Sequence, residues 1–130
     1  MENSILGFTD EYRYLSNFYP CRVVVNGLEF PASEHAYMYG KLKPDADIDL
    51  STYLSVIELT SGQVKKWGRT VEMREDFEYI KDIVMYDAVW SKFTLNEDLK
   101  EKLISTGDSY IEETNSHKDT YWGVCEGVGQ

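Results

Sequence analysis

The sequence predicts an α+β fold that is rich in helix, with short strands and an N-terminal β-hairpin, in one compact domain over residues 1–130. Three observations lead to this prediction. The chain has 130 residues, the size of one ordinary domain. An Asn-Gly pair separates two apolar runs in the first third of the chain, and residues 75–95 repeat apolar side chains at helical spacing.

The predicted hairpin comprises residues 21–25 and residues 28–30, on either side of Asn26 and Gly27. The first run contains three successive valines, and β-branched side chains favour extended backbone. Asn and Gly both accept positive φ, so the pair favours a tight two-residue turn. Pro31 is expected to end the second strand because it lacks a backbone N–H.

Helices are expected through the middle of the chain. A capping residue, Ser33, is expected to open a helix over residues 33–41. The polar residues 43–49 are interpreted as a loop. Two short helices are then predicted, one over residues 51–59 and one over residues 63–67, with a break at Gly62 and its neighbours.

The longest element is predicted over residues 75–95, as an amphipathic helix that covers the core. Its apolar side chains at helical spacing include Phe77, Ile80, Val84 and Ala88. Asn96 is expected to cap a further helix over residues 96–103, whose first turn contains acids. Short extended segments are predicted at residues 110–112 and 121–124.

The chain is strongly acidic, with a net charge of -10 and a sequence pI of about 4.6. A broad nucleic-acid-binding face needs an excess of Lys and Arg. The composition therefore argues against such a face. A local positive pocket in an acidic body remains compatible with it, and would favour a compact anionic ligand over a long polyanion.

The two cysteines, Cys21 and Cys125, are expected to be free, buried thiols. No CxxC motif is present, so a zinc knuckle is not expected. Two isolated thiols indicate a reducing compartment, and no apolar run approaches the roughly 18 residues of a membrane span. We therefore expect a cytoplasmic protein without a membrane partner.

Glu34 and His35 are candidate site residues because they lie where a helix is expected to begin. A helix N-terminus offers free N–H groups and positive potential. The alternative for Glu34 is a first-turn acid that only complements the helix dipole. The alternative for His35 is a hydrogen-bonded packing residue, and the only other histidine, His117, is too distant in sequence to form a metal motif with it.

A second group of candidates is basic, and consists of Lys41, Lys65, Lys66 and Arg69. These side chains are compatible with a solvated helix end and equally with a phosphate clamp, in which Arg is the bidentate partner. A third candidate, Asp119, precedes Trp122 and Gly123. It suits either a turn or a carboxylate beside a flat stacking surface.

Read together, these residues resemble the NADAR family, and the similarity runs through nearly the whole chain. The matching segments are Leu15-Ser16-Asn17-Phe18-Tyr19-Pro20, Phe30-Pro31-Ala32-Ser33-Glu34-His35-Ala36, Lys41, Lys65, Gly68-Arg69, Met85 to Lys92-Phe93, Ser105-Thr106-Gly107-Asp108, Ile111-Glu112-Glu113, Asn115 and Asp119-Thr120-Tyr121-Trp122-Gly123. Two features depart from the family pattern. Phe77 stands where the family usually has Trp, and the family's Gly-x-Asn-x-Leu-Gly helix, expected as one wall of the pocket, would lie beyond Gln130.

The resemblance implies an N-glycosidase. Family members are linked to removal of ADP-ribose from guanine bases and to hydrolysis of early riboflavin-pathway intermediates. Both substrate classes join C1′ of a phosphorylated ribose to an exocyclic amine of a base. We expect removal of ADP-ribose from guanine, in a nucleotide or with nucleic acid as the carrier of the modified base. The alternatives are a ribosylamino-pyrimidine phosphate of riboflavin biosynthesis, a non-catalytic ADP-ribose- or NAD-binding module, and a metal-dependent nuclease.

The roles expected of the site residues follow from that chemistry. Glu34 is expected to stabilise positive charge at C1′, and Asp119 to orient or protonate the leaving amine. Lys41 is expected either to attack C1′ as an amine or to bind phosphate. No cofactor and no metal ligand set is expected. The residues expected to bind substrate are Ser16, Asn17, His35, Tyr37, Lys65, Arg69, Glu112, Trp122 and Gly123.

Overall fold

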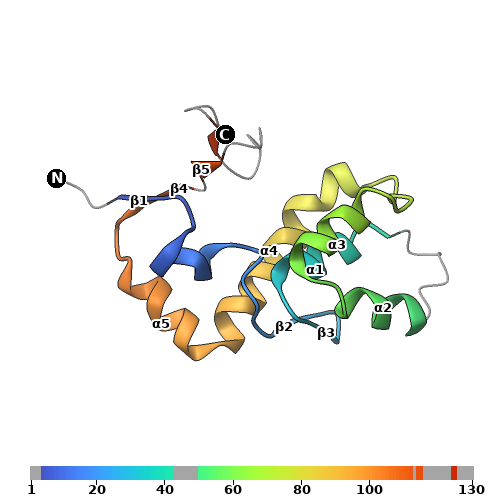
Figure 1. The fold of residues 1–130 in the computed structure, drawn as a ribbon, viewed down its shortest axis with the longest axis horizontal. Helices are drawn as coiled ribbons and strands as arrows, with labels where there is room; N and C mark the ends of the chain where they lie inside the picture. Colours follow the sequence, from blue (N-terminus) through green and yellow to red (C-terminus); the bar gives the residue numbers. More distant parts are fainter. Residues whose placement is uncertain (1–3, 43–49, 113, 116–123, 126–130) are drawn as a thin grey trace. The chain divides into compact units, whose positions relative to one another are not determined.

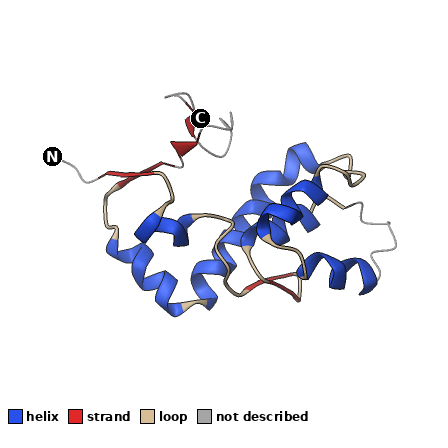
Figure 2. Ribbon diagram, in the orientation of Figure 1, coloured by secondary structure: helices blue, strands red, loops and turns tan. Residues whose placement is uncertain are grey.

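The structure, a computed structural model, describes residues 4–42, 50–112, 114–115 and 124–125 (Figure 1). Its chain contacts define two compact units. The first combines Met1–Ser16 with Glu101–Gln130, and the second is Asn17–Lys100. Most of the described residues are helical, and the strands are short (Figure 2). The α+β class predicted from the sequence is confirmed, whereas the single domain stays a prediction.

The second unit contains the β-hairpin and most of the helices. Its strands are β2 (Val23–Val25) and β3 (Leu28–Phe30), and its helices are α1 (Ser33–Tyr39), α2 (Leu50–Ile57), α3 (Ser61–Gly68) and α4 (Phe77–Leu95). The helix α5 (Glu97–Ser105) begins at the end of this unit and continues into the first. The four helices predicted around residues 33–41, 51–59, 63–67 and 75–95 are therefore present, with ends shifted by a few residues.

The hairpin forms where the sequence predicts it. Strands β2 and β3 pair antiparallel, with Val23 opposite Phe30 and Val25 opposite Leu28. Asn26 and Gly27 have φ values of 51° and 79°, as a tight two-residue turn requires. Strand β2 begins at Val23, and ahead of it the Cys21 N–H still donates to the Pro31 carbonyl at 2.9 Å.

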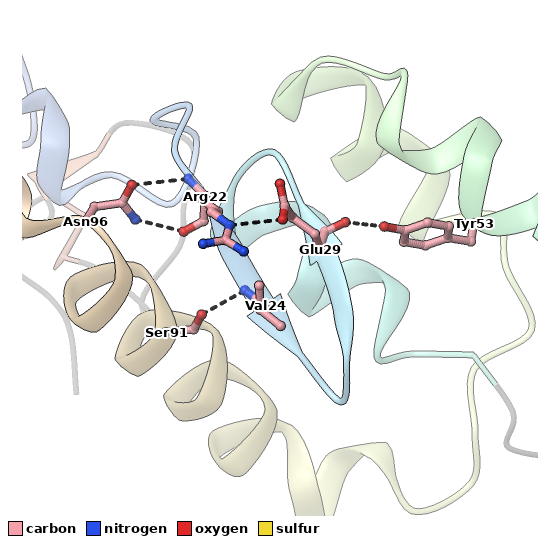
Figure 3. A network of polar contacts seen from close by, with 6 residues as sticks. All are labelled: Arg22, Val24, Glu29, Tyr53, Ser91 and Asn96. Atoms are coloured by element: carbon pink, nitrogen blue, oxygen red, sulfur yellow. Dashed lines mark hydrogen bonds and ion pairs between the residues drawn. The ribbon is translucent and has the colours of Figure 1, made fainter.

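The hairpin is attached to α4 through polar contacts between backbone and side chains (Figure 3). The Val24 N–H donates a hydrogen bond of 2.7 Å to Ser91 Oγ. The Asn96 amide group contacts Arg22 twice, because its Nδ2 donates to the Arg22 carbonyl at 2.7 Å and its Oδ1 accepts from the Arg22 N–H at 3.4 Å. Asn96 directly precedes α5 and its carbonyl accepts from the Lys100 N–H at 2.9 Å, so it occupies the predicted N-cap position, while its Nδ2 also donates to the Lys92 carbonyl at the end of α4.

Helix α1 lies at the centre of the second unit, and every one of its residues is buried. The prediction that Ser33 caps it was wrong, since the N-cap is Ala32 and Ser33 is the first helical residue. Two glycines permit the close packing around α1. A Cβ on Gly68 would lie 2.2 Å from Met38 Sδ, and one on Gly40 would lie 2.7 Å from Val84 Cγ1.

The contact at Gly68 leads to a stability prediction. Gly68→Ala is expected to lower the free energy of unfolding by about 1–3 kcal/mol, because Met38 must leave its position against α3. Gly62→Ala in the same helix is the matched control, since its Cβ would meet nothing within 4 Å. Urea unfolding of both variants measures the difference. Equal stability of the two would show that Gly68 is not needed for close packing.

The first unit contains the remaining strands. β1 (Ser4–Leu6) pairs parallel with β4 (Tyr110–Glu112), and β5 (Thr114–Asn115) pairs parallel with β6 (Val124–Cys125). A 3-10 helix, η1 (Asp10–Leu15), follows β1. The strand at residues 110–112 was predicted, but β1 and η1 were not.

Among the described helices, none combines the length and the hydropathy that crossing a membrane demands.

Candidate functional site

Asn17 fixes the start of α1 to the segment that precedes the hairpin. Its carbonyl oxygen accepts from the Glu34 N–H at 3.0 Å, and its side-chain Oδ1 accepts from Ser33 Oγ at 2.9 Å. Its Nδ2 lies 3.5 Å from Met85 Sδ on α4. The Asn17 side chain therefore joins α1 to α4 and sets the position of Glu34. Its predicted contact with substrate stays a prediction.

Glu34 lies in the first turn of α1 and is 6% exposed. Burial of a carboxylate is costly unless other groups compensate its charge. The Lys41 amine is the cation that compensates it, since the Glu34 carboxylate raises the pKa of Lys41. The structure thus brings together two of the three predicted catalytic residues, two helical turns apart along the chain.

Lys41 follows the end of α1 and is half-buried. Its carbonyl oxygen accepts from the Arg74 N–H at 2.8 Å, which ties it to the segment entering α4. Its Nζ lies 5.9 Å from the centre of the Phe77 ring. Burial lowers the pKa of Lys41 below its usual 10.5, Arg69 and Lys65 lower it further, and Glu34 and Glu78 raise it.

Lys65 and Arg69 lie at the end of α3, and the positive charge of each lowers the pKa of Lys41. Lys65 is half-buried, with its Nζ 5.7 Å from the centre of the Phe18 ring. Arg69 is the C-cap of α3 and is exposed. Helix α3 starts at a capping box between Thr60 and Gln63, and Arg69 forms its C-cap at the other end. Lys65, Arg69 and the buried Glu34 carboxylate therefore all lie within electrostatic range of the Lys41 amine.

Two other predicted substrate-binding residues of this unit are in its core. His35 is 2% exposed, and its Nε2 lies 2.7 Å from the Leu59 carbonyl oxygen. Because that oxygen can only accept a hydrogen bond, Nε2 carries the proton and donates it. Burial lowers the pKa of His35 below 6.5, which favours the neutral ring. Tyr37 is 6% exposed and packs edge-on against Phe77, with ring centres 5.4 Å apart. Both side chains join α1 to its neighbours, and their contact with substrate stays a prediction.

The other predicted residues belong to the first unit or lie outside the described residues. Ser16 and the β4 residue Glu112 belong to the first unit. Asp119, Trp122 and Gly123 lie outside the described residues. The predicted convergence of Asp119 with Glu34 is thus neither confirmed nor contradicted by the structure.

Three residues near the cations were given no role from the sequence. Phe18 and Phe77 place aromatic rings beside the amines of Lys65 and Lys41. Glu78 acts on the charge of Lys41 from the first turn of α4. In the sequence Glu78 has the pattern of a solvent-exposed helix-start acid, and only the pairing of residues 41–42 with residues 73–74 brings it near.

The described residues contain no group of three or more His, Cys, Asp or Glu side chains arranged to hold a metal ion. What they do contain is an amine of lowered pKa next to a carboxylate, with two further cations. A carboxylate can stabilise a developing positive charge, and the cations can bind phosphate. An amine of lowered pKa can act as a nucleophile. This set suits group transfer or hydrolysis on an anionic substrate.

The fold matches that of a solved protein. The NMR structure of the Escherichia coli protein YbiA superposes with a TM-score of 0.76 at 26% sequence identity, and covers 95% of this chain and 73% of that one. The NADAR domain family matches residues 7–129. The chain therefore belongs to the NADAR family, as the sequence motifs indicate.

Three curated relatives extend this finding. The chain is 34% identical over 116 residues to a riboflavin biosynthesis protein of Vibrio vulnificus, and the match covers 88% of this chain but 30% of that protein. It is 30% identical over 114 residues to an N-glycosidase of Nostoc punctiforme, covering 86% of this chain and 72% of the relative. It is 28% identical over 129 residues to the N-glycosidase YbiA of Escherichia coli, covering 95% and 77%. The chain thus spans under a third of the first relative's length and about three quarters of the other two.

Proposed function

We propose that this chain is an N-glycosidase that hydrolyses the bond between C1′ of a phosphorylated ribose and an exocyclic amine of a base. The observation that supports it most directly is the buried carboxylate of Glu34 beside the half-buried amine of Lys41. The cations Lys65 and Arg69 next to this pair suit the phosphate of such a substrate. The names of the Nostoc punctiforme and Escherichia coli relatives support the same class of reaction.

The first substrate we propose is ADP-ribosylated guanine. An exposed Arg69 and a half-buried Lys65 suit a pyrophosphate that extends from the reacting ribose towards solvent. The net charge of -10 opposes binding along a DNA backbone. A free nucleotide, or a base extruded from its strand, needs few backbone contacts and fits better.

The second substrate is a ribosylamino-pyrimidine phosphate of riboflavin biosynthesis. The name of the Vibrio vulnificus relative favours it. Its ribose bears one phosphate, for which one or two cations suffice. Both substrates present the same bond to Glu34, so the same chemistry applies to either.

In the proposed mechanism, loss of the amine places positive charge on C1′ and the ring oxygen. The Glu34 carboxylate stabilises this oxocarbenium-like state. The leaving nitrogen needs a proton from a positioned acid, and Asp119 is the residue we assign to this step. Two carboxylates in different environments can divide these roles between them.

Lys41 provides a covalent variant of this mechanism. A ribosylamine opens to an imine at C1′, and the neutral Lys41 amine adds to that carbon. The bond from C1′ to the base nitrogen breaks, the Lys41 nitrogen passes a proton to the departing base, which leaves as its free amine, and a C1′–Nζ Schiff base remains. Water then adds to C1′ and releases the sugar and the free lysine.

Borohydride treatment during turnover tests the covalent variant. We expect a reduced adduct on Lys41 whose added mass equals that of the reduced sugar phosphate. Peptide mass spectrometry locates it, and a reaction without substrate is the control. An active protein that gives no adduct would contradict the Schiff base and leave Lys41 as a phosphate ligand.

The pH dependence of the reaction provides a second test of Lys41. If the neutral amine attacks, kcat/KM rises with pH up to the pKa of Lys41, which is below 10.5. Arg69→Gln removes a cation that lowers this pKa, so the rise should move to higher pH. Glu78→Gln removes a carboxylate that raises it, so the rise should move to lower pH. Shifts in the same direction would show that another group controls the profile.

A parallel assay tests the proposed function itself. The chain is incubated with ADP-ribosylated guanosine and with the riboflavin intermediate, and chromatography detects released base and sugar phosphate. Calorimetry on the same samples measures binding. Release from either substrate supports the N-glycosidase. Tight binding of ADP-ribose without release from either would indicate a non-catalytic module, and would contradict the proposal.

A further inference from the structure

Helix α4 has two apolar faces, and among the described residues of the second unit only one of them is covered. Its inner face packs into the second unit through buried residues such as Met85 and Ala88. Its outer face carries four large side chains that are mostly exposed to solvent. Their exposed fractions are 87% for Tyr79, 62% for Ile83, 63% for Tyr86 and 61% for Trp90.

These four side chains form a continuous stripe. They are spaced by four, three and four residues, which is the a/d repeat of a helix that packs along a second helix. Tyr86 and Trp90 stack on each other, with ring centres 6.0 Å apart and planes 12° apart. Such a stripe, which we call the α4 seam, is larger than the scattered apolar residues of an ordinary surface.

A hollow continues the α4 seam at its Trp90 end. It has a volume of about 430 Å³ and lies between the hairpin and the second half of α4, lined by Val24, Val25, Asn26, Asp87, Trp90 and Leu95 among others. The hydroxyl groups in its wall already make internal bonds, because Ser91 Oγ accepts from Val24 and Thr94 Oγ1 donates to the Trp90 carbonyl. The hollow therefore offers an apolar wall, an aromatic ring and one carboxylate.

The charges beside the α4 seam indicate what kind of helix fits it. When Tyr79 and Tyr86 are placed at d positions and Ile83 and Trp90 at a positions, Asp82 occupies the flanking g position and Asp87 the flanking e position. A parallel second copy of this chain would place Asp82 against Asp87, and an antiparallel copy would place both carboxylates against the apolar Val89 and Ile80, in neither case with a counter-charge. A helix with Lys or Arg at its flanking positions would instead meet opposite charge.

We propose that the α4 seam and its adjoining hollow dock an amphipathic helix of another protein, with apolar a and d residues and basic flanking residues. The apolar residues of that helix lie along Tyr79, Ile83, Tyr86 and Trp90. One of its long side chains enters the hollow, where the Trp90 ring and the Asp87 carboxylate suit an ammonium or guanidinium group. This inference is independent of the proposed glycosidase activity.

A designed pair of peptides tests the proposal on the intact chain. Both are stapled helices with leucine at a and d, and they carry either lysine or glutamate at e and g. Fluorescence anisotropy measures their binding to the wild-type chain. We expect the lysine peptide to bind at least about tenfold more tightly than the glutamate peptide. Equal binding or no binding would contradict the proposal.

Three variants of the chain locate the binding. Ile83→Asp should abolish it, whereas Ile104→Asp on α5 should not, because Ile104 is exposed to a similar extent, 66%, but lies off the seam. Asp87→Lys should abolish the preference for the lysine peptide, because one acid and one base would then flank the seam. Equal loss in both Ile variants would indicate unspecific adhesion and overturn the proposal. Sedimentation of the wild-type chain as a dimer that Ile83→Asp dissociates would assign the seam to a second copy and overturn it too.

Discussion

Glu34→Gln is expected to lower turnover of a ribosylamine substrate by about 100-fold or more, equivalent to about 3 kcal/mol of barrier. The change keeps the shape of the side chain and removes the negative charge that we propose stabilises the developing positive charge at C1′. Glu34 is buried and its N–H is bonded to Asn17, so its position is fixed before substrate arrives. Such preorganisation makes a charge effective in a transition state.

Glu78→Gln is the matched control for this experiment. Glu78 raises the pKa of Lys41, as Glu34 does, but Glu78 is exposed and forms an ion pair of 2.9 Å with Lys81. We expect its substitution to change the maximal rate by less than about threefold, since exposed charges are weak. Equal losses in both variants would show that the rate does not depend on the buried position of the Glu34 carboxylate. Unchanged turnover in Glu34→Gln would remove it from the catalytic residues.

Lys92→Met is expected to stabilise the chain by about 2 kcal/mol at neutral pH. Lys92 is 1% exposed in α4, and burial lowers its pKa from 10.5 to about 8. That difference corresponds to a cost of about 3 kcal/mol for holding the charged amine inside the folded chain. Loss of the cation–π contacts with Tyr19 and Phe93 offsets about 1 kcal/mol of the gain. Methionine fills a similar volume without a charge.

The sign of the pH dependence separates this effect from improved packing. Between about pH 8 and pH 10.5 the unfolded chain holds the Lys92 proton and the folded chain releases it. The free energy of unfolding contributed by this group therefore rises with pH across that window. In Lys92→Met the rise should vanish, so the advantage of the variant should shrink towards pH 10.5.

Urea unfolding at several pH values measures this, in a Cys21→Ala background. Burial raises the pKa of the Cys21 thiol above 9.0, and the folded chain then keeps a proton that the unfolded chain loses. The contribution of Cys21 to the free energy of unfolding would therefore fall with pH and oppose the contribution of Lys92. A stability gain that is constant over the whole pH range would contradict the assigned cost of the buried charge.

Much of the fold could be predicted from local sequence signals. The Asn26-Gly27 turn needs positive φ, and few other residue pairs adopt it. Helix α4 shows the apolar spacing of a packed helix over most of its length. The side-chain contacts of the helix-capping residues were predicted less well. Ser33 and Asn96 have the right chemistry, but tertiary contacts with Asn17 and Arg22 take up their side chains.

The pairing of distant segments could not be predicted. β1 and β4 are three-residue strands from opposite ends of the chain, and neither shows a strong pattern of its own. Their pairing depends on contacts between residues about 100 positions apart. The family motifs point to the second strand only, so the first was missed.

In the candidate site, too, local sequence signals predicted some residues, whereas contacts between distant segments added others. Glu34, Lys41, Lys65 and Arg69 were predicted from motif and charge, and the structure places them together. The opposing charge of Glu78 and the ring of Phe77 were not, because they approach Lys41 only when residues 41–42 pair with residues 73–74. A chemical pattern thus predicts which charged side chains gather, whereas packing decides which neighbours surround them.

The most direct test of the central claim uses ADP-ribosylated guanosine with heavy nitrogen in the exocyclic amine. Mass spectrometry follows the label during incubation with the wild-type chain and with Glu34→Gln. We expect guanosine that retains the label, together with free ADP-ribose, and a rate about 100-fold lower in the variant. Label that stays on the sugar would place the break at the other side of the nitrogen and contradict cleavage at C1′. Equal product release by the two proteins would contradict the role of the buried carboxylate.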